Sequence, residues 1–279
     1  MTTALITGAT AGIGLEFARQ LAQRKHDLVL VARDVDRLDH VADDLRSTYV
    51  VEVEVLQADL SERDQLQAVA TRLADAARPV EVLVNNAGYG LKGRFLHNDV
   101  ADEERLFDVL TRAVLVLSHS AAGAMRTRGS GTIINVSSVA GFIAGGTYSA
   151  AKAYTTVFTE GLASELKGSG VTATALCPGF TRTEFHDRAK LKMDGMPAFM
   201  WLNAPALVSS CLDDVERGRV ISVPGAQYKA IVGLLRMLPR WLVRATATSS
   251  AHPGRRARQP EQGLTARSGS EPGGIRSSS

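Results

Sequence analysis

The amino-acid sequence predicts an α/β fold, in which a single doubly wound parallel sheet of about seven strands carries helices on both faces. Short apolar runs typical of buried strands alternate with segments of helical spacing through most of the chain. A glycine-rich turn joins the first of these runs to the first helical segment. With 279 residues, 45% of them hydrophobic, the chain is long enough to bury one sizeable core.

The elements follow one another in a regular order. Seven apolar runs are predicted to form strands, at 3–7, 27–32, 51–58, 80–88, 131–138, 171–179 and 219–225. Helical spacing predicts helices at 12–24, 36–49, 61–76, 102–127, 148–168 and 204–218, the third with Ser61 as its N-cap. Because parallel sheets bind ligands beyond the carboxyl ends of their strands, we expect functional residues just after each strand.

Three segments depart from this alternation. Residues 180–203 form a long connection rich in aromatic and Met side chains, which is typical of a lid over a binding site. Residues 226–247 are expected to form an amphipathic helix, basic over 228–247 and kinked at Pro239. Residues 250–279 are poor in large apolar side chains and are expected to be a disordered basic tail. We therefore expect one domain over residues 1–249.

Charge and cysteine content exclude several functional classes. Five Arg and two Glu within residues 251–279 account for the whole net charge of +3, so no basic face for nucleic acid is expected in the domain. Two cysteines do not make a disulfide scaffold, and we assign no metal site. A first strand at residue 3 leaves no room for a secretory signal, and no apolar run of membrane-spanning length is found, so we expect a cytoplasmic protein.

The glycine-rich turn has the sequence TGATAGIG at 7–14, with glycines at Gly8, Gly12 and Gly14. Glycines here would let backbone N–H groups approach a pyrophosphate at the helix N-terminus, where the helix dipole favours negative charge. The spacing differs from the G-x-G-x-x-G of the common dinucleotide fingerprint. A tight strand–helix turn without a ligand is the alternative.

The end of the second strand bears on the choice of cofactor. An acidic residue there grips a ribose 2′-hydroxyl, whereas a basic residue accommodates a 2′-phosphate. This chain has Arg33 at that position, followed by Asp34, which points to the opposite side if the chain is still extended. We therefore expect NADP(H) to be preferred, with NAD(H) as the alternative. Arg33 could instead be a solvated residue at the entry to the next helix.

Five motifs in order resemble those of the short-chain dehydrogenase/reductase family, in its shorter single-domain branch. They are TGATAGIG at 7–14, NNAG at 85–88, INVSS at 134–138, YSAAK at 148–152 and PGFTRTEF at 178–185. The resemblance covers about residues 1–225. It implies a Rossmann fold, a nicotinamide cofactor, the interconversion of an alcohol and a ketone or aldehyde, and assembly into homo-oligomers.

The resemblance also implies roles for individual residues. Tyr148 would be the catalytic acid/base, Lys152 its partner, and Ser138 the group that polarises the substrate oxygen. The residues implied in cofactor binding are Gly8, Thr10, Gly12, Ile13, Gly14, Arg33, Asp59, Leu60, Asn86, Ala87, Gly88, Tyr148, Lys152, Pro178, Gly179 and Thr181.

The chemistry explains why these residue types are needed. A free phenol has a pKa near 10, and Lys152, one helical turn after Tyr148, is expected to lower the pKa of that phenol. Ser138 would donate to the substrate oxygen, where negative charge develops. One position departs from the family pattern: Leu110 stands where the family usually has an Asn that kinks the helix and holds a water behind the Lys.

These features favour an oxidoreductase acting on an apolar alcohol or ketone, because the lid is apolar. Leu110 motivates the alternative, a catalytically impaired dinucleotide-binding sensor or scaffold. A lyase or epimerase with the same cofactor is a third reading. The stretch 228–247 could contact an anionic membrane surface, or could pack on the domain or on another subunit.

Overall fold

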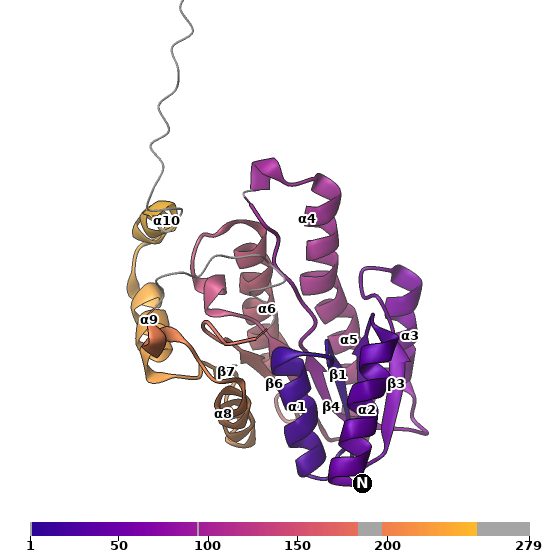
Figure 1. The fold of residues 1–279 in the computed structure, drawn as a ribbon. Coiled ribbons are helices and arrows are strands. Elements are labelled where there is room, and N and C mark those ends of the chain that lie inside the picture. Colours follow the sequence, from indigo (N-terminus) through magenta and orange to yellow (C-terminus); the bar gives the residue numbers. More distant parts are fainter. Residues whose placement is uncertain (1, 94, 184–196, 250–279) are drawn as a thin grey trace, which may run out of the picture.

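The computed structural model describes residues 2–93, 95–183 and 197–249 (Figure 1). Seven strands form one sheet in the order β3-β2-β1-β4-β5-β6-β7, and every pairing is parallel. The strands are β1 Thr3–Thr7, β2 Asp27–Ala32, β3 Val53–Gln57, β4 Val80–Asn85, β5 Gly131–Val136, β6 Val171–Leu176 and β7 Ile221–Ser222. The predicted α/β fold with seven parallel strands is confirmed. Several predicted runs extend past the observed strands at their carboxyl ends, because the chain leaves the sheet there.

Strand order reverses between β1 and β4. The chain runs outward through β2 and β3, returns to the other side of β1, and continues through β4 to β7. Thr3 pairs with Asp27 on one side and with Val80 on the other. Such a reversal opens a crevice at the carboxyl ends of the two central strands, where doubly wound folds bind ligands.

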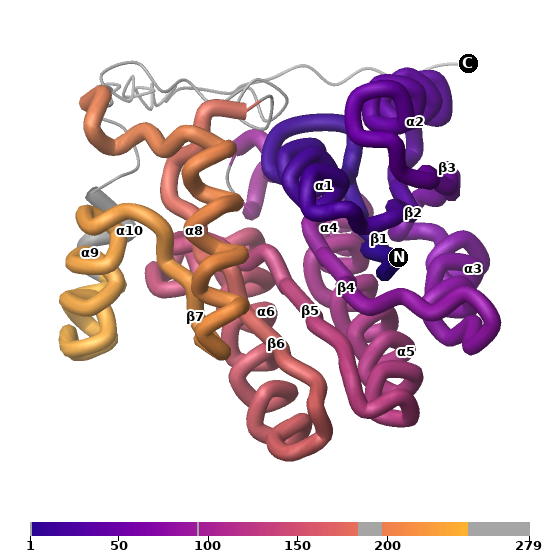
Figure 2. The backbone as a smooth tube through the Cα atoms, turned by 90° about the horizontal axis from the view of Figure 1, so that it is seen from below, coloured from indigo at the N-terminus to yellow at the C-terminus, as the bar shows by residue number. Residues whose placement is uncertain are grey.

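Helices cover both faces of the sheet, as Figure 2 shows in a view from below. On one face lie α1 Gly12–Gln23, α2 Val35–Tyr49 and α8 Ala204–Glu216. On the other lie α3 Arg63–Ala74, α5 Ala113–Arg128 and α6 Gly146–Glu165. Side chains of β1 alternate accordingly: Ile6 packs in the first core and Leu5 in the second. The layers therefore follow from the period-two burial of the strands.

Two predicted helix boundaries are wrong. The third helix begins at Arg63 with Glu62 as its N-cap, and the Ser61 hydroxyl instead donates to Asp59 at 2.7 Å. The stretch 226–247 is not one kinked helix but two, α9 Ala226–Met237 and α10 Arg240–Ser249. Pro239 separates them because it lacks an N–H group and its ring clashes with the preceding turn.

The long helical region after β4 has three parts. Helix α4 Val100–Phe107 continues into a π-helical turn over Asp108–Arg112 and then into α5. The combined stretch Val100–Arg128 has the length and hydropathy of a membrane span, and 56% of its most apolar window is buried inside the fold. A helix in the core of a globular fold can have the same length and hydropathy. Helix α5 is such a helix, because its side chains, including Leu117 and Met125, pack in the core.

Short elements complete the described chain. The 3₁₀ turns are η1 Phe95–His97, η3 Val139–Phe142 and η4 Ala198–Met200. The central part of the predicted lid and the predicted tail 250–279 lie outside the described residues.

Candidate active site

A cavity of about 1070 Å³ lies at the reversal of strand order. It is walled by the segments that follow β1, β2, β3, β4, β5 and β6, together with α6 and α9. Every predicted site residue except Gly14 lines it: Gly8, Thr10, Gly12, Ile13, Arg33, Asp59, Leu60, Asn86, Ala87, Gly88, Ser138, Tyr148, Lys152, Pro178, Gly179 and Thr181. Motifs spread over more than 170 residues of sequence are thus brought into one site.

The glycine turn has the backbone that a phosphate cradle requires. Gly8 and Gly12 have φ of +67° and +56°, which only glycine adopts without strain. Helix α1 begins at Gly12, and its N-cap residue Ala11 offers no side-chain cap. The first N–H groups of α1 are therefore left for an anion, and the helix dipole favours one there.

Gly14 has a packing role instead of lining the cavity. A Cβ atom on Gly14 would lie 2.3 Å from both Asn86 Nδ2 and the Gly8 oxygen. The Asn86 amide donates to the carbonyls of Thr7 at 2.9 Å and Gly8 at 3.2 Å. Asn86 therefore ties the turn after β1 to the turn after β4, and Gly14 leaves space for it.

Arginines gather at the end of β2. The Arg33 side chain is 66% exposed, and its Nη1 lies 3.8 Å from Asp59 Oδ2. Asp34 accepts from the N–H of Arg37 at 3.1 Å as the N-cap of α2, so its carboxylate is engaged there. Arg37 also lines the cavity and donates to the Thr10 carbonyl at 3.3 Å. Sequence reasoning missed Arg37, which lies in the first turn of α2, four residues after Arg33 in the chain.

The residues of the predicted catalytic group lie together, just after β5 and on α6. Ser138 follows β5, caps η3 by accepting from the N–H of Ala140 at 3.1 Å, and is hydrogen-bonded to Tyr148. The Lys152 ammonium lies 5.8 Å from the centre of the Tyr148 ring and donates to the Val136 carbonyl at 2.7 Å.

Helix α6 is anchored to β5 at the same point. The Ser137 hydroxyl donates to the Lys152 carbonyl at 2.7 Å. Ser137 is 2% exposed and Lys152 is 5% exposed, so both groups sit out of water. The Lys152 side chain is thereby fixed at both its main chain and its ammonium.

Burial controls the protonation of the pair. It raises the pKa of Tyr148 to about 12, against a lowering effect of the hydrogen bond with Ser138. It lowers the pKa of Lys152 to about 8, against a raising effect of Cys177. Burial therefore outweighs the lowering influences on the pKa of Tyr148, and a lowering of that pKa by Lys152 stays a prediction.

Leu110 lies in the π-helical turn, close to Lys152. It is 1% exposed and packs with Leu106, Ala151 and the partly buried Tyr148. A Cβ atom on Gly88 would lie 2.8 Å from Leu110 Cδ2 and 3.8 Å from Lys152 Nζ. The helix is thus distorted at the expected place without an Asn, and the Leu110 methyl group and the Lys152 ammonium both lie near Gly88.

The hydroxyls near Leu110 are engaged with main-chain carbonyls. Thr111, one residue on, donates to the Phe107 carbonyl at 2.5 Å and does not replace the Asn. Thr155 of α6 donates to the carbonyls of Leu110 at 3.3 Å and Ala151 at 3.1 Å. Within the described residues, the Leu110 carbonyl is therefore held by α6.

The other end of the cavity is apolar. Its wall is made by Val139, Ile143, Phe180, Met200, Tyr228, Ile231 and Leu235. Of the predicted lid side chains, Phe180 and Met200 take part, whereas Phe199 is 68% exposed. Phe185, Met193 and Met196 lie outside the described residues.

Sequence reasoning missed the contribution of α9 to this wall. The Tyr228 hydroxyl accepts from the N–H of Phe180 at 3.0 Å and donates to the Met200 carbonyl at 2.7 Å. The described parts of the 180–203 connection are thereby pinned to α9.

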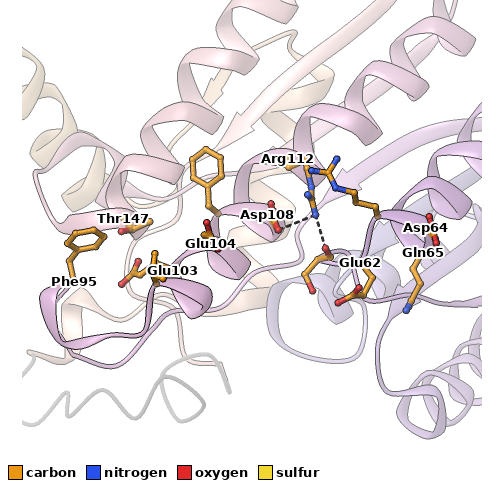
Figure 3. Close-up of a pocket in the computed structure, with 13 residues that line it drawn as sticks. Glu62, Asp64, Gln65, Phe95, Glu103, Glu104, Asp108, Arg112 and Thr147 are labelled. Carbon is orange, nitrogen blue, oxygen red and sulfur yellow. Dashed lines mark hydrogen bonds and ion pairs between the residues drawn. The ribbon is translucent and has the colours of Figure 1, made fainter.

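A second hollow, of about 1040 Å³, opens between the start of α3 and α4 (Figure 3). It contains five carboxylates, those of Glu62, Asp64, Glu103, Glu104 and Asp108. Arg112 lies 3.2 Å from Asp108 and donates to the Ser61 carbonyl at 2.7 Å. None of the predicted site residues lines this hollow, so the cavity at the strand reversal is the candidate active site.

Comparison with known proteins identifies the family of the chain. The family model for short chain dehydrogenases matches residues 2–194. Over 181 residues the chain is 32% identical to the ketoacyl reductase HetN of Nostoc sp., a match that covers 64% of this chain and 63% of that protein. The chain thus matches less than two thirds of that relative's length.

Solved structures match over nearly the whole chain. A short-chain dehydrogenase from Sphingobium yanoikuyae, in complex with NADPH, is 35% identical with a TM-score of 0.77, covering 94% of this chain and 99% of its own. The bulky-bulky ketone specific alcohol dehydrogenase from Comamonas testosteroni is 31% identical with a TM-score of 0.74, covering 95% and 99%. By its family model, its sheet and these relatives, the chain belongs to the short-chain dehydrogenase/reductase family.

Proposed function

We propose that this short-chain dehydrogenase/reductase reduces a bulky, mainly apolar ketone or aldehyde to an alcohol with NADP(H). The observation that carries the proposal is the placement of Ser138, Tyr148 and Lys152 within one cavity whose two ends differ in chemistry. Glycines and arginines line one end, and aromatic and aliphatic side chains line the other. A charged cofactor and an apolar substrate suit such a division.

The residues present fit a nicotinamide dinucleotide. The uncapped start of α1 suits the pyrophosphate, and Gly8 and Gly12 keep the turn free of side chains. Asp59, Leu60 and the 86–88 turn would hold the adenine and ribose side of the cleft. When bound, the cofactor supplies the hydride.

Tyr148 supplies the proton in this proposal. With a pKa of about 12, the phenol is protonated at neutral pH and can donate to the oxygen of a carbonyl. The Ser138 hydroxyl accepts from the Ala140 N–H at 3.1 Å and donates to the Pro178 carbonyl at 3.5 Å, a long contact from which its proton can turn to the same substrate oxygen. Lys152, still largely protonated below its pKa of about 8, stabilises the phenolate that remains.

Two arginines support the preference for NADP(H). Arg33 and Arg37 both line the cavity where the second strand ends, the place at which doubly wound folds contact the adenosine ribose. Guanidinium groups pair well with a phosphate and offer nothing comparable to an unmodified 2′-hydroxyl.

The size of the substrate is proposed from the apolar wall and the relatives. Phe180, Met200, Ile231 and Leu235 come from separate segments and enclose room beyond Tyr148. One solved relative is named for bulky-bulky ketones and one sequence relative is named a ketoacyl reductase. Both names describe carbonyl compounds, and the first describes bulky ones.

The test combines cofactor binding and turnover. NADPH binding is measured by fluorescence, and carbonyl compounds of graded size are then screened by loss of the reduced-nicotinamide absorbance. We expect Tyr148→Phe to bind NADPH like the wild type and to lose at least about 100-fold in kcat, because only the proton donor is removed. Turnover that survives in Tyr148→Phe would overturn the mechanism. Leu110 favours the impaired sensor or scaffold as second candidate, and binding without turnover of any carbonyl would support it.

We further propose a homo-oligomer in a reducing cytoplasm. Phe107, Leu115 and Val157 are 52%, 45% and 67% exposed on α4, α5 and α6, a face that a second copy could cover. Cys177 and Cys211 are both free and buried, so the fold uses no disulfide between them. Light scattering after size exclusion reports the oligomeric state, and a monomer at micromolar concentration would contradict the assembly.

A further inference from the structure

The C-terminal part of the chain has an unusual charge distribution. Residues 217–260 contain nine Lys or Arg and neither Asp nor Glu. Helices α9 and α10 lie in the middle of this segment (Figure 1). A stretch of one sign of charge is a footprint for a partner of the opposite sign.

Large apolar side chains are exposed on the same two helices. Leu234, Met237 and Trp241 are 56%, 79% and 62% exposed. Leu234 and Met237 are three residues apart on α9 and so share a face, and Trp241 follows directly after the break at Pro239. We call these three residues the C-terminal apolar stripe.

Basic side chains accompany the stripe. Lys229, Arg240 and Arg244 are exposed, and no ion pair involves them within the part of the chain that the structure describes. Arg236 differs, because it lies 3.9 Å from Glu160 and 5.2 Å from the centre of the Phe142 ring. Arg236 therefore faces the domain, whereas the other three basic groups face solvent.

The opposite face of α9 lines the candidate active site. Ile231 and Leu235 belong to the apolar wall of the cavity, and Tyr228 and Val232 are buried. Helix α9 thus separates the substrate end of the cavity from the surface that bears the C-terminal apolar stripe.

We propose that α9 and α10 dock on an anionic lipid surface, with the C-terminal apolar stripe entering the interface and Lys229, Arg240 and Arg244 contacting the headgroups. Trp, Met and Leu flanked by basic residues suit such a surface. A second copy in a symmetric contact would bring the same basic groups together. The chain's own tail, with five Arg and two Glu after residue 250, is also basic. Of these partners, only an anionic surface neutralises the basic side chains and also covers the exposed apolar side chains.

The inference does not rest on the proposed reaction, because it is measured as binding. Purified full-length protein is sedimented with vesicles of phosphatidylcholine alone and of phosphatidylcholine with phosphatidylglycerol. We expect co-sedimentation with the anionic vesicles, weakening as salt is added, since the headgroup attraction is screened. Binding to neither vesicle, or equal binding to both, would overturn the proposal.

Two variants localise the contact. Replacing Lys229, Arg240 and Arg244 by Gln should lower the partition coefficient roughly 100-fold, because each basic residue near the surface contributes about fivefold. The matched control replaces the exposed Arg19, Arg24 and Arg126 by Gln and should bind almost unchanged. Equal weakening by both sets would contradict docking through α9 and α10.

The two tryptophans allow a direct readout of insertion. In a Trp201→Phe protein, the remaining indole is Trp241, and its emission should shift to the blue when anionic vesicles are added. An unshifted emission would refute insertion of the stripe. A change of oligomeric state in Leu234→Gln/Met237→Gln, without a loss of vesicle binding, would assign the stripe to a second copy and overturn the proposal.

Discussion

The Thr155 hydroxyl donates to the main-chain carbonyl of Leu110 at 3.3 Å, across the contact between α6 and the π-helical turn. Thr155 is fully buried and lies three residues after Lys152. The turn that would normally contain an Asn in this family is thus held from the helix that bears Tyr148 and Lys152. A π turn has one main-chain bond fewer than a regular helix, so an external donor to its carbonyl is a stabilising contact.

Replacing Thr155 by Val should therefore loosen this turn. We expect a loss of about 1–2 kcal/mol in the free energy of unfolding, because a buried carbonyl loses a donor. If the turn also positions Lys152, kcat should fall several-fold with little change in KM. Thr155→Ser keeps the hydroxyl and should restore kcat. Urea denaturation and initial rates measure both, and a Val variant with wild-type kcat would limit Thr155 to stability.

Lys152 is expected to reduce the stability of the fold while serving the reaction. Its folded pKa of about 8 is below the value of an exposed Lys, so its charge costs free energy below pH 8. Between about pH 8 and pH 10.5, Lys152 is protonated in the unfolded chain but neutral in the folded protein. The free energy of unfolding should therefore rise as the pH increases through this range. Lys152→Met should lack this rise, be more stable near pH 7 by about 1–3 kcal/mol, and be inactive. Urea midpoints at two pH values test it, and a less stable Met variant near pH 7 would contradict it.

The pH dependence of the reaction should reflect the titration of Lys152. Tyr148 stays protonated throughout the neutral range, so the reductive kcat/KM should be flat below pH 8. Above that value it should fall as Lys152 loses the charge that stabilises the phenolate. Lys152→Arg keeps its charge, and any activity it retains should lack this fall. A wild-type profile without a decline between about pH 7 and 9 would contradict the assignment.

Arg33 and Arg37 should decide between the two nicotinamide cofactors. We expect Arg33→Ala and Arg37→Ala each to weaken NADPH binding about tenfold and to leave NADH binding nearly unchanged, because only NADPH carries the 2′-phosphate. Arg19→Ala, on the exposed side of α1, is the control and should change neither. Fluorescence titration gives both dissociation constants. Tighter binding of NADH than NADPH by the wild type would refute the preference.

Gly179 should tolerate no side chain, because a Cβ atom there would lie 2.0 Å from the Tyr228 ring. Gly179→Ala should destabilise the protein by about 1–3 kcal/mol through overpacking and should enlarge KM, since Tyr228 pins the substrate wall. In a Tyr228→Ala background the same change should cost much less. Gly123→Ala, with nothing within 4 Å of its Cβ, is the control and should be neutral or stabilising. Equal effects of Gly179→Ala in both backgrounds would exclude the clash.

Much of the fold could be predicted from local pattern. Apolar runs fixed all seven strands to within a few residues, because a buried parallel strand needs a continuous apolar sequence. One helix boundary was wrong because a side chain has a different local partner: Ser61 bonds Asp59, two residues before it, instead of capping α3. The two C-terminal helices were merged because a proline permits either a kink or a break, and packing decides between them.

The candidate site likewise contains residues that the sequence predicted and residues that it did not. Tyr148, Lys152, Ser138 and the glycine turn could be assigned from short motifs, since each depends on neighbours within one turn or strand end. Gly14 does not line the cavity, because it leaves space for Asn86, which is remote in sequence, and its predicted part in cofactor binding stays a prediction. Ile231 and Leu235 were missed because nothing local distinguishes an apolar residue that lines a cavity from one that packs in the core.

The sequence by itself determined the alternation of strands and helices, the order of the motifs, and the chemical groups at the ends of the strands. Only the tertiary structure decided how those groups behave. Burial raises the pKa of Tyr148, and α6 holds the π turn through Thr155. Hydrogen-bond reach and desolvation depend on what packs around a residue, and that packing brings together segments that are far apart in the chain.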